Sequence, residues 1–366
     1  MKVMLLGAGS VIHTQRWANG LVQAGAQVLC ASQHDFLPGG WDERVERVRL
    51  DKSGNAGYFL NAHSLRRLYV ARGCELLNAH YASGYGVLAT LAGARPRLVS
   101  VWGSDVYDFP RTSLVHRAVL RRVLTSADAL ASTSVAMAGQ VERLLGRAKR
   151  AVAVTPFGVD LDAFAPRPAS ATHAGAALII GTVKTLASKY GIDTLLRAFA
   201  RLPPRHDDRA LCLRIVGDGP DRAALAALAV QLGIDARCEF VGAVAHADVP
   251  AQLHDFDIFV AASRLDSESF GVAVVEASAC ALPVVVTRVG GLPEVVSENE
   301  TGLVVGREDV AALARALQLL IDDAGLRERL GRSGRSWVAQ RYEWRTCVER
   351  MLQTYREVLA SAGHFA

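Results

Sequence analysis

Residues Glu268–Glu276 read ESFGVAVVE, which places two carboxylates eight positions apart around a Phe-Gly step. Eight residues are slightly more than two helical turns, so both carboxylates face the same side if a helix begins near Gly271. The first N–H groups of that helix lack intrahelical partners and would lie between the carboxylates. The pattern suits a phosphate flanked by hydroxyl-rich groups. An ordinary amphipathic helix without a ligand fits the same nine residues equally well.

On both sides of this segment, short apolar runs alternate with helical patterns. We expect strands at 3–6, 27–31, 76–79, 98–101, 129–132, 178–181, 212–216, 238–241 and 258–261. We expect helices at 15–23, 114–124, 191–201 and 221–232, and a final amphipathic helix at about 344–359. This alternation predicts an α/β protein with parallel sheets covered by helices on both faces.

The length and a change in composition predict two domains. At 366 residues the chain is long for one core and comfortable for two. Residues 164–175 are rich in Pro, Ala and Ser and are typical of a linker. We therefore predict doubly wound domains at 1–165 and 166–344, facing each other across a cleft at the carboxyl ends of their strands.

The composition is that of a compact globular protein, because 51% of the residues are hydrophobic and no tract is of low complexity. Polar residues and glycines interrupt the longest charge-free stretch, 76–94, which is therefore no membrane span. The N-terminus is too short and too strand-like for a signal peptide. Six scattered cysteines without a CxxC pair predict neither disulfides nor a structural zinc. These features favour a reducing cytoplasm.

Charge is distributed unevenly between the two halves. Residues 1–165 carry 19 Lys and Arg against 12 Asp and Glu, whereas residues 166–366 carry 22 against 24. An anionic lipid surface, an anionic acceptor or nucleic acid could each bind the basic half, and a solvated surface explains any single cluster equally well. No zinc-finger spacing or RRM aromatic pattern accompanies the charge, so we expect no nucleic-acid partner.

Candidate binding residues in the first half follow predicted strands. The turn 7–10, Gly-Ala-Gly-Ser, follows the first strand, but Ile12 replaces the third glycine of a dinucleotide fold and no acidic residue ends the second strand. We therefore expect a glycine turn that a ligand can approach, and no NAD. His13, one turn into the following helix, contacts a ligand or caps the cleft.

Two further segments, His80 and the run Trp102–Asp105, follow later strands. A pair formed by His80 and Asp105 could orient or deprotonate a hydroxyl group. A structural histidine hydrogen-bonded to the backbone fits His80 equally well.

In the second half, Lys184 and Lys189 follow a predicted strand and are well placed to neutralise a diphosphate, although exposed lysines are the simpler alternative. Residues 217–220, Gly-Asp-Gly-Pro, predict a turn before a helix. The segment 255–257, Asp-Phe-Asp, resembles a metal-binding DxD, but it precedes a strand. We therefore predict a turn or a helix end there.

Taken in order, these segments resemble the family 4 glycosyltransferases of the GT-B fold over nearly the whole chain. The motifs that carry the resemblance are Gly7–Ser10, Pro156–Asp160, Lys184, Lys189, Gly217–Pro220, Ser267–Glu276, Gly290–Glu294 and Thr301–Val305.

The resemblance implies two Rossmann-like domains, with the C-terminal helix (about 345–366) crossing back to the N-terminal domain. The domain 166–344 would bind a nucleotide-sugar, with UDP favoured and GDP possible, and the domain 1–165 would bind a glycan or lipid-linked acceptor. The implied reaction is a retaining hexosyl transfer without metal or cofactor, in the biosynthesis of a bacterial surface polysaccharide such as lipopolysaccharide. The implied location is the cytoplasm, with peripheral contact to the anionic inner membrane.

The resemblance also implies roles for individual residues. Glu268 would bind the sugar hydroxyls, Glu276 the ribose, and Lys184 and Lys189 the pyrophosphate. The other donor-binding residues would be Gly9, Gly217, Asp218, Ser269, Phe270, Gly271 and Val272, with Val244 in the base-contacting loop 242–246. The acceptor side would be formed by Ser10, His13, His80, Trp102 and Asp105. The catalytic candidates are Lys184, Lys189, Glu268 and His80.

Two positions depart from the family pattern. Trp102 stands where many members carry His, which leaves His80 and His13 as the alternatives for a catalytic histidine. Phe157 replaces the usual Asn, and we interpret it as a packing difference. Two rival functions stay open: a nucleotide-sugar 2-epimerase or hydrolase on the same fold, and a non-catalytic sugar-binding subunit.

Overall fold

The computed structural model describes residues 1–148, 150–168 and 177–363. It divides into two compact units, one formed by Met1–Pro156 together with the chain from Arg345 onward, the other by Phe157–Trp344. The first unit thus ends at Pro156, whereas the sequence suggested a boundary at 165–166. Most of the expected linker, residues 169–176, lies outside the described residues.

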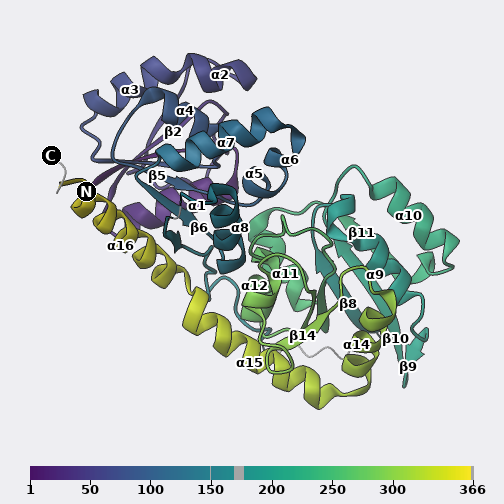
Figure 1. The fold of residues 1–366 in the computed structure, drawn as a ribbon. Coiled ribbons are helices and arrows are strands. Elements are labelled where there is room, and N and C mark those ends of the chain that lie inside the picture. Colours follow the sequence, from purple (N-terminus) through teal and green to yellow (C-terminus); the bar gives the residue numbers. More distant parts are fainter. Residues whose placement is uncertain (149, 169–176, 364–366) are drawn as a thin grey trace. The chain divides into compact units, whose positions relative to one another are not determined.

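The first unit contains a sheet whose described strands are all parallel, in the order β3-β2-β1-β4-β5-β6-β7. The strands are β1 Lys2–Leu6, β2 Gln27–Ser32, β3 Glu46–Arg49, β4 Leu76–His80, β5 Arg97–Ser100, β6 Ala129–Ser132 and β7 Val152–Val154 (Figure 1). The chain winds in opposite directions from the neighbours β1 and β4. In doubly wound folds, ligands bind beyond the carboxyl ends of two such strands.

Helices cover both faces of this sheet. They are α1 Ile12–Gln23, α2 Gly54–Leu60, α3 Ala62–Ala71, α4 Tyr85–Ala92, α5 Ser104–Tyr107, α6 Phe109–Thr112, α7 Leu114–Ser126, α8 Val135–Leu145 and α16 Trp344–Gly363. On one face, Leu77 and Val99 pack beneath α3, α4, α7 and α8. On the other face, Asn78 Nδ2 donates a hydrogen bond to the Tyr355 hydroxyl of α16 at 2.7 Å, and Ser100 Oγ donates to Asn78 Oδ1 at 2.9 Å.

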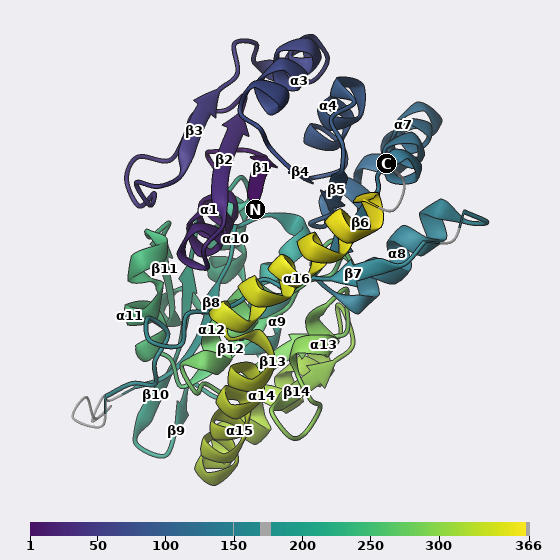
Figure 2. The same ribbon diagram turned by 90° about the vertical axis from the view of Figure 1, so that its left-hand side faces the viewer.

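The second unit repeats the architecture with a sheet in the order β11-β10-β8-β12-β13-β14 (Figure 2). The strands are β8 Ala177–Val183, β9 Arg205–His206, β10 Arg209–Val216, β11 Cys238–Gly242, β12 Ile258–Ala261, β13 Val284–Thr287 and β14 Gly302–Val305. Among the described strands, only β9 is antiparallel, to β10. The direction of winding reverses between β8 and β12.

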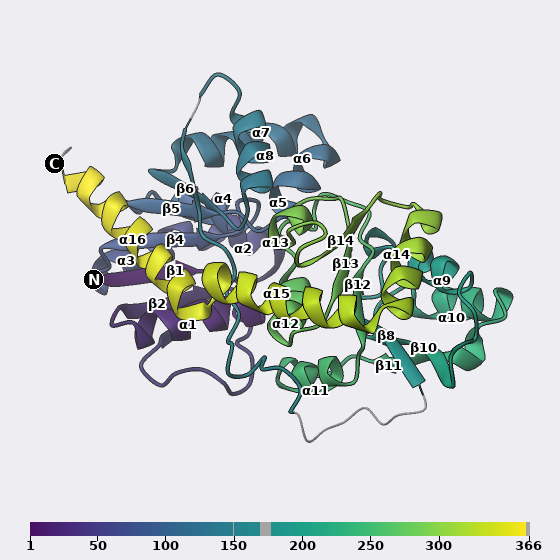
Figure 3. The same cartoon turned by 90° about the horizontal axis from the view of Figure 1, so that it is seen from below.

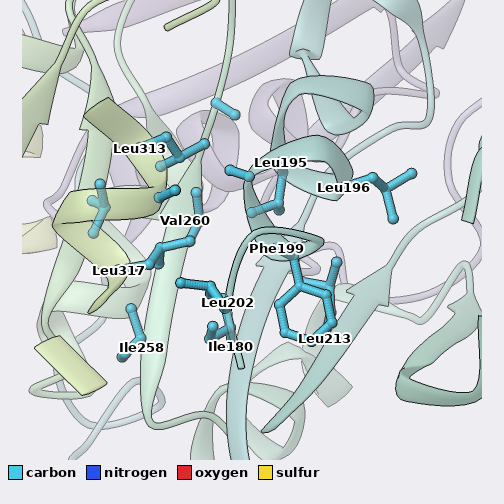
Figure 4. Close-up of a cluster of buried hydrophobic side chains, with 14 of the residues drawn as sticks. Ile180, Leu195, Leu196, Phe199, Leu202, Leu213, Ile258, Val260, Leu313 and Leu317 are labelled. Atoms are coloured by element: carbon cyan, nitrogen blue, oxygen red, sulfur yellow. The ribbon is translucent and has the colours of Figure 1, made fainter. Parts of the chain in front are cut away.

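The helical segments of this unit are η1 Ser188–Tyr190, α9 Ile192–Phe199, α10 Arg222–Gln231, η2 Asp235–Arg237, η3 His246–Asp248, α11 Val249–His254, α12 Val272–Ala279, α13 Leu292–Val295, α14 Val310–Asp322 and α15 Ala324–Tyr342. The core joins Phe199 of α9 and Leu317 of α14 to the sheet residues Ile180, Leu213 and Ile258 (Figure 4). Figure 3 shows α15 running alongside α12, with which it is in contact.

The predicted two-domain α/β architecture is confirmed. Every strand and helix that we expected by range is present, with bounds shifted by a few residues. Asp255 caps the C-terminus of α11, as predicted for the DxD segment, and Asp257 pairs with Arg209 at 3.2 Å. No helix in the described part of the chain is long and apolar enough to cross a bilayer.

The contact between Asn78 and Tyr355 generates a stability prediction. Replacing Tyr355 by Phe leaves the amide of Asn78 buried without its acceptor, and we expect the free energy of unfolding to fall by about 1–3 kcal/mol in urea titrations. Gln353→Ala, on the exposed side of the same helix, should change it by less than about 0.5 kcal/mol. Equal effects of the two substitutions would contradict the prediction.

Candidate functional site

The strands on either side of the winding reversal in the second unit bring Lys184 and Glu268 together. Lys184 directly follows β8, and Glu268 lies in the loop after β12. The Lys184 Nζ atom is 2.6 Å from Glu268 Oε2, and Ser263 Oγ donates a hydrogen bond to the same oxygen at 3.1 Å. Glu268 is only 9% exposed, so these two contacts offset the loss of hydration of its carboxylate. Two residues predicted from separate motifs therefore form one ion pair.

Lys184 and Lys189 also share an aromatic partner. Their Nζ atoms lie 4.6 Å and 5.0 Å from the centre of the Tyr190 ring. The ring attracts both cations and keeps them close together, despite their mutual repulsion. The role of Tyr190 was missed by the sequence reasoning, because its position next to Lys189 was the only signal.

The turn at 217–220 supports the loop that carries the lysines. The Lys184 N–H donates to the carbonyl of Val216 at 2.9 Å, and the Leu186 N–H donates to that of Asp218 at 3.0 Å. The Asp218 carboxylate accepts a hydrogen bond from the Gly219 N–H at 2.7 Å, and the Gly217 N–H donates to the Gly242 carbonyl at 2.8 Å. The observed contacts of Gly217 and Asp218 therefore support the loop that carries Lys184.

Helix α12 begins where the sequence predicted, and its first residue follows Gly271. Gly271 has a φ of +93°, a backbone conformation that would strain any residue with a Cβ atom, and a Cβ there would also lie 2.6 Å from Leu292 Cδ2. Helix geometry leaves the first N–H groups of α12, beginning at Val272, without intrahelical acceptors and gives this end a partial positive charge. These groups can bind an anion.

The residues before Gly271 are buried. The Phe270 ring packs against the rings of Phe157 and Tyr342, with centroids 6.0 Å and 5.4 Å away. Phe157 thus fills a packing role, as predicted. Ser269 is also buried, so the side chains of Ser269 and Phe270 have little surface available to a ligand.

Glu276 has a partner that its spacing could not reveal. Glu276 is 4% exposed, and its Oε1 atom is 2.8 Å from His246 Nε2. His246 opens η3 at the end of the loop 242–246, in which Val244 is half-buried. The carboxylate expected at the ribose is thereby joined to the loop expected at the base. Because Glu276 is buried and paired, α12 is no ordinary amphipathic helix with a solvated acidic face.

In the first unit, His80 ends β4 beside the winding reversal. It is 1% exposed, and its ring centroid is 4.4 Å from that of Trp102, which also meets the edge of His13 at 6.1 Å. Burial, followed by the charge of His13, lowers the pKa of His80 to about 3. His80 is therefore neutral near pH 7, and its buried Nδ1 atom has no hydrogen-bond partner among the described residues.

Of the two alternatives left open by the sequence, the pair of Asp105 with His80 does not form. Its Oδ1 atom accepts hydrogen bonds from the N–H groups of Gly103 and Trp102 at 2.8 and 3.2 Å, and its Oδ2 atom accepts one from Ala82 at 2.8 Å. Burial raises the pKa of Asp105 despite these bonds. The carboxylate fastens the loops after β4 and β5 to each other, which is a structural role.

The glycine turn after β1 is partly covered. The Gly9 N–H donates to Ser32 Oγ at 2.9 Å, and the ring of Phe36 packs directly on Gly9. Ser10 is exposed. Within this unit, Ser10 is thus better placed than Gly9 to meet a ligand.

Comparison with known proteins defines the class of this architecture. Residues 168–337 match the family model described as Glycosyl transferases group 1, and residues 2–134 match that described as Glycosyl transferase 4-like. Sucrose-phosphate synthase from Thermosynechococcus elongatus superimposes with a TM-score of 0.86 at 22% identity, over 99% of this chain and 100% of its own. Anabaena Alr3699/HepE, solved with UDP, gives 0.82 at 19% identity, over 98% and 100%. The fold is GT-B, and the protein is a glycosyltransferase, as predicted.

Sequence similarity to one glycosyltransferase identifies the family to which the chain belongs. Over 281 residues, the chain is 33% identical to the GDP-mannose-dependent alpha-(1-6)-phosphatidylinositol monomannoside mannosyltransferase of Mycolicibacterium smegmatis, which corresponds to 73% of this chain and 72% of that protein. The chain belongs to glycosyltransferase family 4, which confirms the resemblance of its motifs.

The burial of His80 predicts a pH dependence of stability. Below the ordinary pKa of 6.5, His80 is protonated in the unfolded chain. In the folded protein it stays neutral until about pH 3. The free energy of unfolding should therefore fall with decreasing pH through this window, by up to about 1.4 kcal/mol per pH unit. His80→Leu should remove that part of the slope in urea titrations at about pH 7 and about pH 5. His63→Gln, at an exposed position on α3, should retain it.

A second prediction concerns Gly290, which supports Glu268. Gly290 has a φ of +50°, and a Cβ atom there would lie 2.1 Å from the Glu268 carbonyl oxygen. Gly290→Ala should therefore displace the Glu268 segment, lower the free energy of unfolding by about 2–4 kcal/mol and weaken nucleotide binding. Gly233→Ala has a similar φ of +69° but meets nothing within 4 Å. It should lose only about 1–2 kcal/mol and leave nucleotide binding intact.

Proposed function

We propose that the protein is a retaining glycosyltransferase that moves a hexose from a nucleotide-sugar to a glycan or lipid-linked acceptor, in the biosynthesis of a bacterial surface polysaccharide. The observation that carries this proposal is the ion pair of Lys184 and Glu268 at the winding reversal of the second sheet. Further positive charge in the same unit is provided by Lys189, in the segment after β8, and by the N-terminus of α12, in the segment after β12.

The positive groups are assigned to the diphosphate of the donor. As the glycosidic bond breaks, the leaving diphosphate gathers negative charge, and fixed cations stabilise it without reorganising. Lys184, Lys189 and the first N–H groups of α12 provide such charge. On this basis we propose a transfer that needs no metal and no other cofactor. The leaving phosphate takes the proton of the acceptor hydroxyl, so no protein nucleophile is required.

The two carboxylates are assigned to hydroxyl groups. Lys184 and Ser263 orient Glu268 through Oε2, and His246 orients Glu276 through Oε1. The other oxygen of Glu268 would accept hydrogen bonds from the transferred sugar, and that of Glu276 from the ribose. A buried acceptor that a ligand hydroxyl satisfies discriminates strongly against ligands that lack the hydroxyl.

The residues at the carboxyl edge of the first sheet are assigned to the acceptor side. Ser10 and His13 would contact the acceptor, with Trp102 packed against His13. Because His80 is neutral, we assign it a hydrogen bond through its ring rather than the role of a cationic acid.

Two donor bases are supported by different observations. The family motifs favour UDP, whereas the relative from Mycolicibacterium smegmatis is named for GDP-mannose. We place the reaction in the cytoplasm, at the inner face of the membrane that would carry a lipid-linked acceptor.

A thermal-shift comparison tests the donor site. Saturating UDP or GDP should raise the melting temperature, because a ligand at about 100 times its Kd stabilises the folded state by about 2.7 kcal/mol. Lys189→Gln should weaken this binding roughly tenfold by removing a charge-assisted contact. Arg315→Gln, at an exposed position on α14, should not. Absence of a shift with both nucleotides would refute the proposal.

Product analysis separates transfer from the rival reaction. A transferase should consume donor in proportion to added acceptor and yield a glycoside of unchanged anomeric configuration. Release of a free or 2-epimerised sugar from the donor alone, at a rate independent of acceptor, would instead identify an epimerase or hydrolase.

A further inference from the structure

Gly7 and His80 occupy matching positions at the ends of two neighbouring strands. In the register of β1 and β4, Leu6 stands opposite Ala79, and Gly7 and His80 are the residues that follow them. A Cβ atom on Gly7 would lie 3.3 Å from the Cβ atom of His80 and 3.2 Å from its Nδ1 atom. The Nδ1 side of the buried imidazole ring therefore faces Gly7.

Thr14, in the first turn of α1, approaches the same point from the other side of the strand end. Its Oγ1 atom would lie 3.3 Å from the same Cβ position on Gly7. Thr14 is 0% exposed, and Oγ1 has no hydrogen-bond partner among the described residues. A threonine in a helix ordinarily donates to a carbonyl three or four residues earlier, and Thr14 makes no such bond. Its hydroxyl proton is therefore available to a partner outside the helix.

The backbone conformation of Gly7 does not require glycine, because its φ is not positive. A side chain is instead disfavoured by the neighbours, since a Cβ atom would come within 3.3 Å of both polar atoms and occupy the room between them. Buried polar atoms that lack a protein partner are usually satisfied by a buried water molecule, which makes about two to four hydrogen bonds. Nδ1 of His80 and Oγ1 of Thr14 are two such atoms, directed at one point.

We propose that one buried water molecule beside Gly7 bridges Thr14 Oγ1 to His80 Nδ1, so that Thr14 positions His80 for the acceptor. The proposal rests on the proposed function, which places His80 on the acceptor side, and adds a positioning residue to that side. The Thr14 hydroxyl donates to the water, and the water donates to Nδ1. In this direction the hydroxyl proton and the Nδ1 lone pair both gain partners, whereas the reverse direction leaves the hydroxyl proton buried without an acceptor.

The direction of the bridge determines which nitrogen of His80 carries the proton. Because Nδ1 accepts a hydrogen bond, the single proton of the neutral ring is on Nε2. The lowered pKa of His80, about 3, is consistent with a neutral ring near pH 7. Nε2 would then donate to an oxygen atom of the acceptor or of the leaving phosphate, and it would not remove a proton from a hydroxyl group. Trp102 packs against the same ring at 4.4 Å between centroids and restricts its rotation.

Nitrogen-15 spectra of protein labelled in its histidine rings test the bridge without a ligand. The signals of His80 are those missing from the spectrum of His80→Leu. Near pH 7, Nδ1 should give the resonance of an unprotonated nitrogen that accepts a hydrogen bond. Thr14→Val, which keeps the shape of the side chain and removes the hydroxyl, should move this resonance toward that of a nitrogen without a hydrogen bond. Thr14→Ser, which keeps the hydroxyl, should leave it in place.

A glycine pair and a second threonine provide the controls for these spectra. Gly7→Ala takes the room of the water and should move the Nδ1 resonance as Thr14→Val does. Gly139→Ala should not, since Gly139 also has no positive φ and a Cβ there meets only Arg143, at 3.7 Å. Thr354→Val, on α16, removes a hydroxyl that donates to the Arg350 carbonyl at 3.0 Å and should not move it either. A proton on Nδ1 in the unmodified protein, or a resonance unaffected by Thr14→Val, would overturn the proposal.

A double-mutant cycle in urea separates the bridge from ordinary packing. Thr14→Val should lower the folding equilibrium constant roughly tenfold in the unmodified protein, because the buried Nδ1 atom loses its donor. In the background of His80→Leu, which has no ring nitrogen, it should lower the constant less than about twofold. Thr354→Val should have the same effect in both backgrounds. Equal effects of Thr14→Val in both would mean that Thr14 only packs against His80, which would contradict the bridge.

Nucleotide binding distinguishes failure of this inference from failure of the proposed function. The residues assigned to the diphosphate and the ribose lie in the second unit, so Thr14→Val should keep the thermal shift with UDP or GDP. A normal shift without the expected change at Nδ1 would reject only the role of Thr14. No shift in the unmodified protein would reject the donor site of the proposed function itself.

Discussion

The contact on which the candidate site depends is the 2.6 Å ion pair between Lys184 and Glu268. A carboxylate that is 9% exposed is unstable in a folded protein unless a cation or several donors accompany it. The parallel sheet provides the cation, because β8 and β12 are neighbours and end at the same edge. The turns at 217–220 and 290–291 hold the two loops in place through backbone hydrogen bonds to Leu186 and Glu268. The candidate site is thus a consequence of strand order, because the winding reversal brings the loops after β8 and β12 to the same edge of the sheet.

The charged groups of the candidate site are held in positions that would suit the proposed anionic ligand with its hydroxyl groups. Tyr190 holds two lysines close together, and His246 and Ser263 each orient a buried carboxylate. Groups fixed in advance lose little conformational entropy when the ligand arrives, so more of their interaction energy remains for binding. In the proposed function, the same fixed charges would stabilise the leaving diphosphate at the moment of transfer.

The sequence predicted the elements with strong periodicity and the motifs at their ends, and it missed contacts between distant segments. Buried strands such as β12 are continuous apolar runs, which single them out, whereas the edge strand β3 (Glu-Arg-Val-Arg) is polar and gave no such signal. The spacing of Glu268 and Glu276 predicted α12 and its start. The partner His246 lies thirty residues from Glu276, and no local pattern links them. The pair of His80 and Asp105, which the sequence left as one alternative, does not form, because a carboxylate that binds backbone N–H groups looks, in sequence, like one that binds a histidine.

The tie between Asn78 and Tyr355 has a consequence for the order in which the protein can be made. The first unit is built from two separate stretches of chain, and the second unit is encoded between them. During synthesis the ribosome therefore completes residues 157–344 before it produces α16. Until then, the face of the first sheet that holds Asn78 lacks its covering helix. During this time one face of the first sheet stays exposed, whereas the second unit is complete and can already fold.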